Sequence, residues 1–289
     1  MSSKSFAELM LLAAIWGASF LFMRIGSPEF GPLLFMALRT LTAALFLTPF
    51  MVLKKQHSQL HGRWHQVFIM GAFNTAIPFA LFAYAVLSLS AGVTSVLNAT
   101  TPIFGAIVAF FWLKDKITPL AMIGLALGFI GVYVLMSDRL AADAQSTFLP
   151  ALACLAATFC YAIAANYTKQ YMSDIKPLAL AAGSQISSAA MLLPLGLFFL
   201  PNTMPSGMAW LVVVVLGVLC TGLAYIIFFR LIADVGPTKA ISVTYLIPVF
   251  GLMWGSIFLD EAITLTIIAG CGSILTGVGL TTGFIGRRR

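Results

Sequence analysis

Long apolar runs, separated by short polar connections, follow one another along the whole chain. A helix needs about 20 mostly apolar residues to cross a bilayer. Strands of a membrane β-barrel would instead alternate apolar and polar residues over about ten positions, and these runs are continuously apolar. We therefore expect an all-α membrane protein with ten transmembrane helices, at residues 6–23, 32–53, 66–88, 91–112, 119–137, 147–168, 177–200, 208–231, 236–258 and 263–285.

The composition supports a protein surrounded by lipid. Of the 289 residues, 61% are hydrophobic and 9% are charged, whereas soluble domains carry about 25% charged residues. The net charge of +7 does not indicate nucleic-acid binding, because the basic residues are spread over short connections and form no basic aromatic face. We therefore expect the protein to lie in the lipid bilayer and to bind no nucleic acid.

The basic residues also predict the orientation. Lys and Arg accumulate in the cytoplasmic connections of membrane proteins. With the N-terminus inside, thirteen of the sixteen basic residues fall on the cytoplasmic side, Arg24 and Arg139 fall outside, and Arg39 lies within a span. Both termini are therefore predicted to be cytoplasmic.

The second half of the chain repeats the first. A shift of 146 residues places the fourth and fifth spans on the ninth and tenth, and a shift of 145 places the first two spans on the sixth and seventh. The matched pairs include Pro102 with Pro248, Gly105 with Gly251, Asp115 with Glu261 and Trp16 with Tyr161. We expect one repeat at residues 1–143 (spans one to five) and another at 144–289 (spans six to ten).

An odd number of spans in each repeat inverts the second repeat in the membrane. The charges agree, because KDK after the fourth span lies on the predicted inside, and its counterpart DEA after the ninth span lies outside. Inverted repeats are typical of secondary transporters, in which the two halves rock around a site between them. The repeats therefore predict a transporter.

Several segments carry a family resemblance: IWGASFLFMR in the first span, FMALRTL in the second, and the related blocks TPIFGAIVAFFWLKDK and IPVFGLMWGSIFLDEAIT. With these motifs and the ten-span pattern, the chain resembles the EamA-type family of the drug/metabolite transporter superfamily. The resemblance implies export or uptake of small metabolites such as amino acids. It also implies a central cavity between the repeats, with spans five and ten outside it.

A polar patch and a helix breaker stand together in the apolar stretch NATTPIFGAIVAF, residues 98–110, and VTYLIPVFGLMWG is its counterpart. Irregular backbone is tolerated at membrane depth only where it faces protein or a water-filled cavity, and proline removes a backbone donor. We expect Pro102 and Pro248 to act as helix hinges. The predicted lining of a central substrate-binding cavity is Trp16, Ser19, Arg39, Asn74, Pro78, Thr94, Asn98, Thr101, Tyr161, Thr221, Tyr225, Thr244 and Tyr245.

Arg39 is the one full charge deep in a predicted span. A charge at the bilayer centre costs at least about 2.5–3.5 kcal/mol, so Arg39 must face the interior. Two roles are open for it: recognition of an anionic group such as a carboxylate, and a structural hydrogen-bond hub on helix carbonyls. For any single Ser or Thr in the set, a bond between helices, contributing about 0.6 kcal/mol, is the commoner role.

Other residue types narrow the chemistry. No Asp or Glu lies in mid-span, which favours uniport or a coupling without a buried carboxylate, although Glu8 stands at the cytoplasmic edge of the first span. Four isolated cysteines indicate neither disulfides nor zinc. His57, His61 and His65 recur at four-residue intervals but belong to a connection that we expect to be solvated. We expect no catalytic residues, no metal site and no cofactor.

Glycines recur in the fifth and tenth spans at intervals typical of helix-packing faces. We interpret these faces as packing surfaces that could also support a homodimer. The glycines are Gly124, Gly128, Gly131, Gly270, Gly277, Gly279 and Gly283.

Together these features predict a secondary transporter, an exporter or facilitator, that moves small metabolites by alternating access across the bacterial cytoplasmic (inner) membrane. Amino acids or related polar or amphipathic solutes are the expected class. The alternatives are a proton-coupled multidrug or cation efflux carrier, a membrane-embedded enzyme and a channel. The enzyme is disfavoured because the spans hold no cluster of His, Asp, Glu or Cys.

Overall fold

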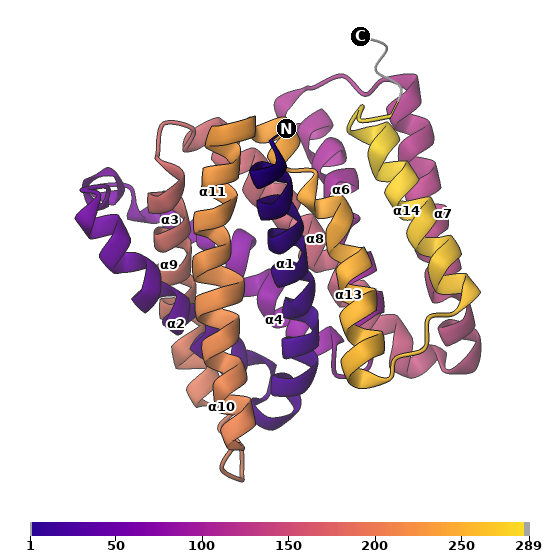
Figure 1. Ribbon diagram of the computed structural model, residues 1–289, viewed down its shortest axis with the longest axis horizontal. Coiled ribbons are helices and arrows are strands. Elements are labelled where there is room, and N and C mark those ends of the chain that lie inside the picture. Colours follow the sequence, from indigo (N-terminus) through magenta and orange to yellow (C-terminus); the bar gives the residue numbers. More distant parts are fainter. Residues whose placement is uncertain (1, 286–289) are drawn as a thin grey trace.

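The computed structural model describes residues 2–285, and within that range the chain forms helices and no strands. Six helices run without interruption: α1 (Ser3–Phe30), α2 (Pro32–Leu53), α7 (Pro119–Ala142), α8 (Ala144–Tyr171), α9 (Pro177–Leu197) and α14 (Leu265–Thr281). They stand side by side in one bundle, and the start of α1 and the end of α14 lie at the same end of it (Figure 1).

The remaining helices come in pieces. The third expected span consists of α3 (Trp64–Gly71), the π-helix η2 (Ala72–Ala76) and α4 (Ile77–Ala85), preceded by the short 3-10 helix η1 (His57–Leu60). The fourth consists of α5 (Ala91–Asn98), α6 (Thr101–Val108) and the π-helix η3 (Ala109–Leu113). The eighth consists of α10 (Gly207–Val214), the π-helix η4 (Val215–Leu223) and α11 (Ala224–Val235), and the ninth of α12 (Pro237–Ala240) and α13 (Val243–Leu259).

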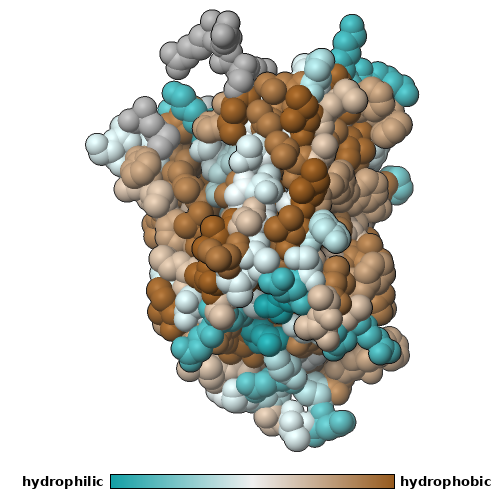
Figure 2. Space-filling model, turned by 90° about the vertical axis from the view of Figure 1, so that its right-hand side faces the viewer, coloured by the Kyte–Doolittle hydropathy of each residue, from teal (hydrophilic) through white to brown (hydrophobic). Residues whose placement is uncertain are grey.

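Eight helical stretches in the described part of the chain are long and apolar enough to cross a membrane, and α13 and α14 are shorter apolar helices of 17 residues each. The expected all-helical membrane protein is thus confirmed at this level, while the count of ten spans stays a prediction. Hydrophobic residues cover most of the flank formed by α7 and α14, and hydrophilic residues gather towards its ends (Figure 2). Exposed apolar side chains on this flank suit contact with lipid; they include Met122, Ile123, Ile130, Leu265 and Ile268.

Helix α1 extends to Phe30, seven residues beyond its expected end at residue 23. The sequence prediction stopped at Arg24 because a charge ordinarily marks the edge of a span. In the structure the Arg24 guanidinium donates to the carbonyl oxygens of Val86 and, at 2.8 Å, of Leu87. These carbonyls follow α4 and compensate the charge, so the helix continues past it.

The two prolines expected to act as hinges differ in their surroundings. The fourth span is interrupted at residues 99 and 100, and Pro102 stands in the first turn of α6, where its missing N–H costs no hydrogen bond. Pro248 lies inside the continuous helix α13, and the ninth span is interrupted at residues 241 and 242 instead. The shared proline therefore marks a break in one span only, and hinge motion at either residue stays a prediction.

A carboxylate secures the start of α5. Glu261 accepts hydrogen bonds from the backbone N–H groups of Ala91, at 2.7 Å, and Gly92, at 3.0 Å. A negative charge at a helix N-terminus is stabilised by the exposed N–H groups and the helix dipole. Asp115, its counterpart in the first half, instead pairs with Lys169 at 3.3 Å. The connection after α13 thus stabilises the N-terminus of α5, about 170 residues earlier in the chain.

Helices α7 and α14 pack closely through their glycines. A Cβ atom at Gly277 would come within 2.6 Å of the Gly124 carbonyl oxygen and the Gly128 nitrogen. Gly131 and Gly270 likewise face the partner helix. Gly128 also faces Ile103, and Gly279 faces Ile285. Gly283 lies beyond the end of α14 with a φ of +69°. The predicted glycine faces of α7 and α14 thus pack against each other within one chain. A homodimer through these faces remains an expectation.

Replacing Gly277 with Ala tests this packing. The added methyl group would press on backbone atoms of α7, and overpacking of this kind costs about 1–3 kcal/mol. We expect Gly277→Ala to lower the apparent Tm of the detergent-purified protein. Gly272 is the matched control, because a Cβ there has open space on the same helix; Gly272→Ala should leave the Tm unchanged or raise it. Equal Tm values for the two variants would contradict the packing.

The Glu261 contact gives a second prediction. Glu261→Gln removes the charge and one of two accepting oxygens, which we expect to cost about 1–2 kcal/mol of stability. The matched control is Asp260→Asn, because Asp260 is an exposed carboxylate with a φ of +52°, a conformation that Asn tolerates. A thermal melt should separate the two variants, and equal stability would mean that the cap contributes little.

Candidate functional site

Arg39 lies on α2 in the interior of the bundle, with 4% of its surface exposed. Its Nε donates to the Thr221 hydroxyl of the π-helix η4 at 3.1 Å. Its Nη1 lies 3.8 Å from the Met23 sulfur, a weak acceptor, and the guanidinium carbon lies 3.8 Å from the centre of the Phe79 ring. A cation over an aromatic face is attracted by the negative face of the ring.

No carboxylate compensates this charge among residues 2–285. The ion pairs there are Arg63–Asp174, Lys169–Asp115 and Arg230–Glu8. Guanidinium has five N–H donors, and within the described residues Nη2 has no hydrogen-bond acceptor. The site therefore holds a buried positive charge with free hydrogen-bonding capacity, which is a suitable partner for an anionic group.

Polar and aromatic side chains from other helices surround Arg39. Tyr161 of α8, Cys220 of η4 and Tyr225 of α11 lie close enough to interact electrostatically with the guanidinium. The Ser19 hydroxyl of α1 is buried without a hydrogen-bond partner among the described residues and lies beside Cys220. Asn74 of η2 lies next to the Tyr225 hydroxyl.

Aromatic rings form one boundary of this cluster. Trp16 of α1 packs 5.2 Å from Phe228 and 6.4 Å from Tyr225, measured between ring centroids. Phe82 of α4 stacks on Tyr161 at 6.0 Å. The structure thus brings together seven of the thirteen residues that the sequence predicts: Trp16, Ser19, Arg39, Asn74, Tyr161, Thr221 and Tyr225.

Among the described residues, no hydrogen bond or ring contact joins the other predicted residues, Pro78, Thr94, Asn98, Thr101, Thr244 and Tyr245, to this cluster. The hydroxyls of Thr94, Thr101 and Thr244 donate to carbonyls of their own chain segment, at Ser90, Asn98 and Ile241. Tyr245 is hydrogen-bonded to Thr282 at 2.7 Å and packs on Phe284, beside the end of α14. Pro78 stands in the first turn of α4. Helical spacing identified shared faces but could not show which of them meet at one point.

A group of buried polar residues on α9 was missed by the sequence analysis. It consists of Ser184, Gln185, Ser187 and Ser188, which pack against Thr75 of η2 and the helix α3 before it. The sequence signal was available as the polar run SQISS inside an apolar span. The prediction concentrated on the third, fourth, eighth and ninth spans and therefore left out the seventh.

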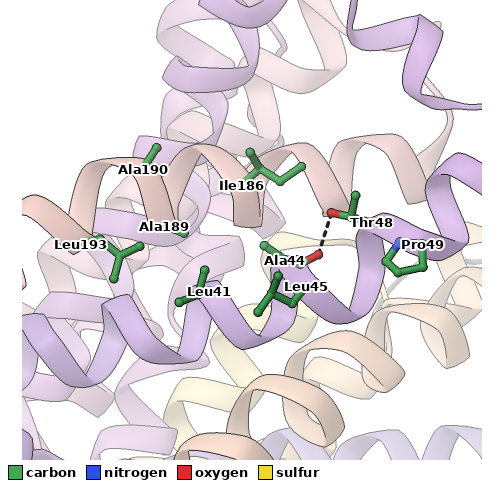
Figure 3. A pocket seen from close by; sticks show the side chains of 9 residues that line it. All are labelled: Leu41, Ala44, Leu45, Thr48, Pro49, Ile186, Ala189, Ala190 and Leu193. Carbon is green, nitrogen blue, oxygen red and sulfur yellow. Dashed lines mark hydrogen bonds between the residues drawn. The ribbon is translucent and has the colours of Figure 1, made fainter.

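An apolar groove lies between α2 and α9, and Arg39 does not line it. It has a volume of about 550 Å³ and is lined by Leu41, Ala44, Leu45, Thr48, Pro49, Ile186, Ala189, Ala190 and Leu193 (Figure 3). Its hydroxyl, on Thr48, donates to the Ala44 carbonyl at 2.7 Å, so it is already satisfied. This groove offers nothing that would orient a polar solute, and none of the predicted cavity residues lines it.

Within residues 2–285 no group of three or more His, Cys, Asp or Glu side chains is arranged to hold a metal ion. The three histidines fall on different segments, since His57 begins η1, His61 follows it and His65 lies in α3. They therefore do not share the helical face that their spacing allowed. The four cysteines are free and buried.

Known proteins resemble the chain over almost its whole length. An uncharacterized transporter of Bacillus subtilis, YoaV, is 27% identical and aligns over 97% of each chain. A transporter of Archaeoglobus fulgidus is 26% identical over 95% of this chain and 97% of its own. A protein of Escherichia coli named a probable amino-acid metabolite efflux pump is 25% identical over 96% of this chain and 94% of its own.

A solved crystal structure has the same fold, with a TM-score of 0.67, 18% identity and coverage of 99% of both chains. The model of the EamA-like transporter family matches twice, at residues 6–137 and 148–283. Family membership agrees with a bundle of apolar helices around a buried polar cluster, and it points to a transporter and not to an enzyme. The chain belongs to the EamA-like transporter family.

Proposed function

We propose that this protein is a secondary transporter that carries small metabolites with a carboxylate group, most of all amino acids, across the bacterial inner membrane by alternating access. The Arg39 cluster is its solute site. The observation that carries the proposal is a buried guanidinium without an acidic partner among the described residues. A carboxylate would accept its free N–H donors in a charge-assisted pair. The naming of an Escherichia coli relative as a probable amino-acid metabolite efflux pump supports this solute class.

Alternating access requires two halves that can exchange roles, and repeat-related contacts support such halves at residues 1–143 and 144–289. Arg39 bonds to Thr221, and their counterparts Ser184 and Thr75 lie 3.2 Å apart. The backbone N–H of Asp115 donates to Ala109, and that of Glu261 to Gly255, both at 3.2 Å. Each pair recurs at a shift of 145 or 146 residues.

A cation efflux carrier is the second candidate, and the charge at the site opposes it. A cationic drug would meet the positive guanidinium with no carboxylate beside it among the described residues. Glu8, in the second turn of α1, pairs with Arg230 at 3.4 Å. An anionic or zwitterionic solute fits the site better.

Arg39→Gln and Arg39→Lys, reconstituted in vesicles, test the proposal. We expect wild-type protein to catalyse saturable counterflow of labelled L-leucine or L-serine. Arg39→Gln should fold, because removing an uncompensated buried charge relieves its desolvation cost, and should lose at least about tenfold of the transport rate, while Arg39→Lys keeps more. Arg139→Gln, at the predicted outer end of α7, is the matched control and should transport normally.

Each other result has a defined meaning. Loss of folded protein in both Arg39 variants would assign Arg39 a structural role, as a hub for Thr221 and Phe79. Unsaturable conductance would indicate a channel. Transport of a quaternary ammonium compound in place of the amino acids would favour the cation carrier.

We further propose ten spans with both termini in the cytoplasm. Cysteines introduced at Ser58, between α2 and α3, and at Thr203, between α9 and α10, test the orientation, because the four native cysteines are buried. In intact cells a membrane-impermeant maleimide should label Thr203→Cys, whereas Ser58→Cys should react only after permeabilisation. The reverse labelling would invert the topology.

A further inference from the structure

The buried polar group on α9 contains one hydrogen-bonding atom without a partner. Gln185 is fully buried, and its Nε2 donates to the hydroxyls of Ser184 at 3.3 Å and Thr75 at 3.5 Å. Its Oε1 has no partner among residues 2–285. Buried polar atoms are almost always paired, so an acceptor left free at this depth calls for an explanation.

The hydroxyl contacts agree with this orientation of the amide. When the Ser184 hydroxyl donates to the Ala181 carbonyl at 3.2 Å, its oxygen accepts from Thr75 in the 3.2 Å contact between the two hydroxyls. Both hydroxyl hydrogens are then used, and the two oxygens can only accept from Gln185. In this arrangement the amide nitrogen faces the two hydroxyls, and the amide oxygen points away from them.

The hydroxyl hydrogens of the neighbouring serines are also used within the protein. Ser187 donates to the carbonyls of Ser184 at 3.1 Å and Val67 at 3.3 Å, and Ser188 donates to that of Gly71 at 3.0 Å. Every hydroxyl hydrogen of the group is thus committed to the protein. What the group can offer a ligand is an acceptor, and a ligand must bring a donor such as an ammonium or hydroxyl group.

This acceptor is connected to the Arg39 site through Asn74. The Asn74 amide reaches the Thr75 hydroxyl at 3.4 Å and lies next to the Tyr225 hydroxyl, and Tyr225 is one of the side chains close to the guanidinium. Asn74 and Thr75 both belong to the π-helix η2, and such segments frequently occur at functional sites. Asn74 therefore lies between the polar group that holds Gln185 and the side chains around Arg39.

Gln185 and Arg39 also break the repeat in a complementary way. The counterpart of Gln185 in the first half is Thr40, whose hydroxyl is satisfied by the Met36 and Ala37 carbonyls at 2.9 Å. The counterpart of Arg39 in the second half is Ser184. At each of these two positions, the other half of the chain packs with a small hydroxyl residue, Thr40 or Ser184. The longer side chains of Gln185 and Arg39 therefore provide hydrogen-bonding groups that packing does not require.

We propose that Gln185 is a specificity-determining residue, whose Oε1 accepts a hydrogen bond from the ammonium or hydroxyl group of a solute held through its carboxylate at Arg39. This inference rests on the proposed function and narrows its solute class from carboxylates in general to amino acids and hydroxy acids. A simple carboxylic acid would satisfy Arg39 and leave Gln185 unpaired.

Counterflow in vesicles with matched probes tests the role of Gln185. The probes are L-leucine against 4-methylpentanoate, which lacks the ammonium group, and L-serine against propanoate. We expect Gln185→Met, which keeps the size and removes the acceptor, to raise the KM of the amino acid roughly five- to tenfold and to leave the KM of the simple acid unchanged. Gln185→Glu, protonated because burial disfavours a carboxylate, keeps an acceptor oxygen and a hydroxyl that can donate towards Ser184 and Thr75, and should keep the preference for the amino acid.

Gln66→Met is the matched control, because the Gln66 Oε1 is also buried without a partner among the described residues but lies in the first turn of α3, near the end of the bundle. It should leave both KM values unchanged. An equal KM change for the amino acid and the simple acid in Gln185→Met, or loss of folded protein in both Gln185 variants, would overturn the inference and leave the proposed function standing. Absence of saturable counterflow in the wild type would overturn the proposed function, and this inference with it.

Discussion

The uncompensated charge of Arg39 is the constraint on which the centre of this protein depends. A guanidinium in the middle of a bilayer protein cannot face lipid, so α2 must turn this side inward. Once there, the charge needs a polar and polarisable shell. Thr221 accepts one hydrogen bond, Phe79 offers its ring face and Met23 its sulfur. These contacts make the buried charge tolerable without neutralising it, which leaves it available to an anionic solute.

The irregular helices follow from the same demand for polar contacts in an apolar medium. Within the π-helix η4 the Thr221 hydroxyl both accepts from Arg39 and donates to the Leu216 carbonyl at 2.9 Å. In η2 Asn74 and Thr75 face the Arg39 cluster and the polar group of α9. A regular α-helix would place these side chains differently around the axis, because a π turn adds one residue. Local irregularity therefore positions the polar side chains that surround Arg39 and the polar group of α9.

The flanks have a different task, which they perform with different residues. At α7 and α14 the glycines let two backbones approach closely, and the outer surface carries apolar side chains that suit lipid (Figure 2). At one end of the bundle, Glu261 holds the start of α5. A closely packed flank beside a polar centre agrees with the proposed alternating access, in which the helices around Arg39 would move.

The sequence by itself determined the all-helical membrane architecture, because continuously apolar runs of this length lack the alternation of barrel strands and satisfy their backbone in a bilayer as helices. It also identified Arg39, since a charge within such a run is visible without coordinates. Only the tertiary structure decided which polar faces meet. Thr94 and Tyr245 have the same spacing signals as Thr221 and Tyr225, yet they bond elsewhere. The structure likewise added Gln185, because the orientation of its amide depends on a hydroxyl acceptor, Thr75, that lies more than one hundred residues away in the chain. Periodicity along a helix reports its faces, but the distances between helices depend on packing that no single segment encodes.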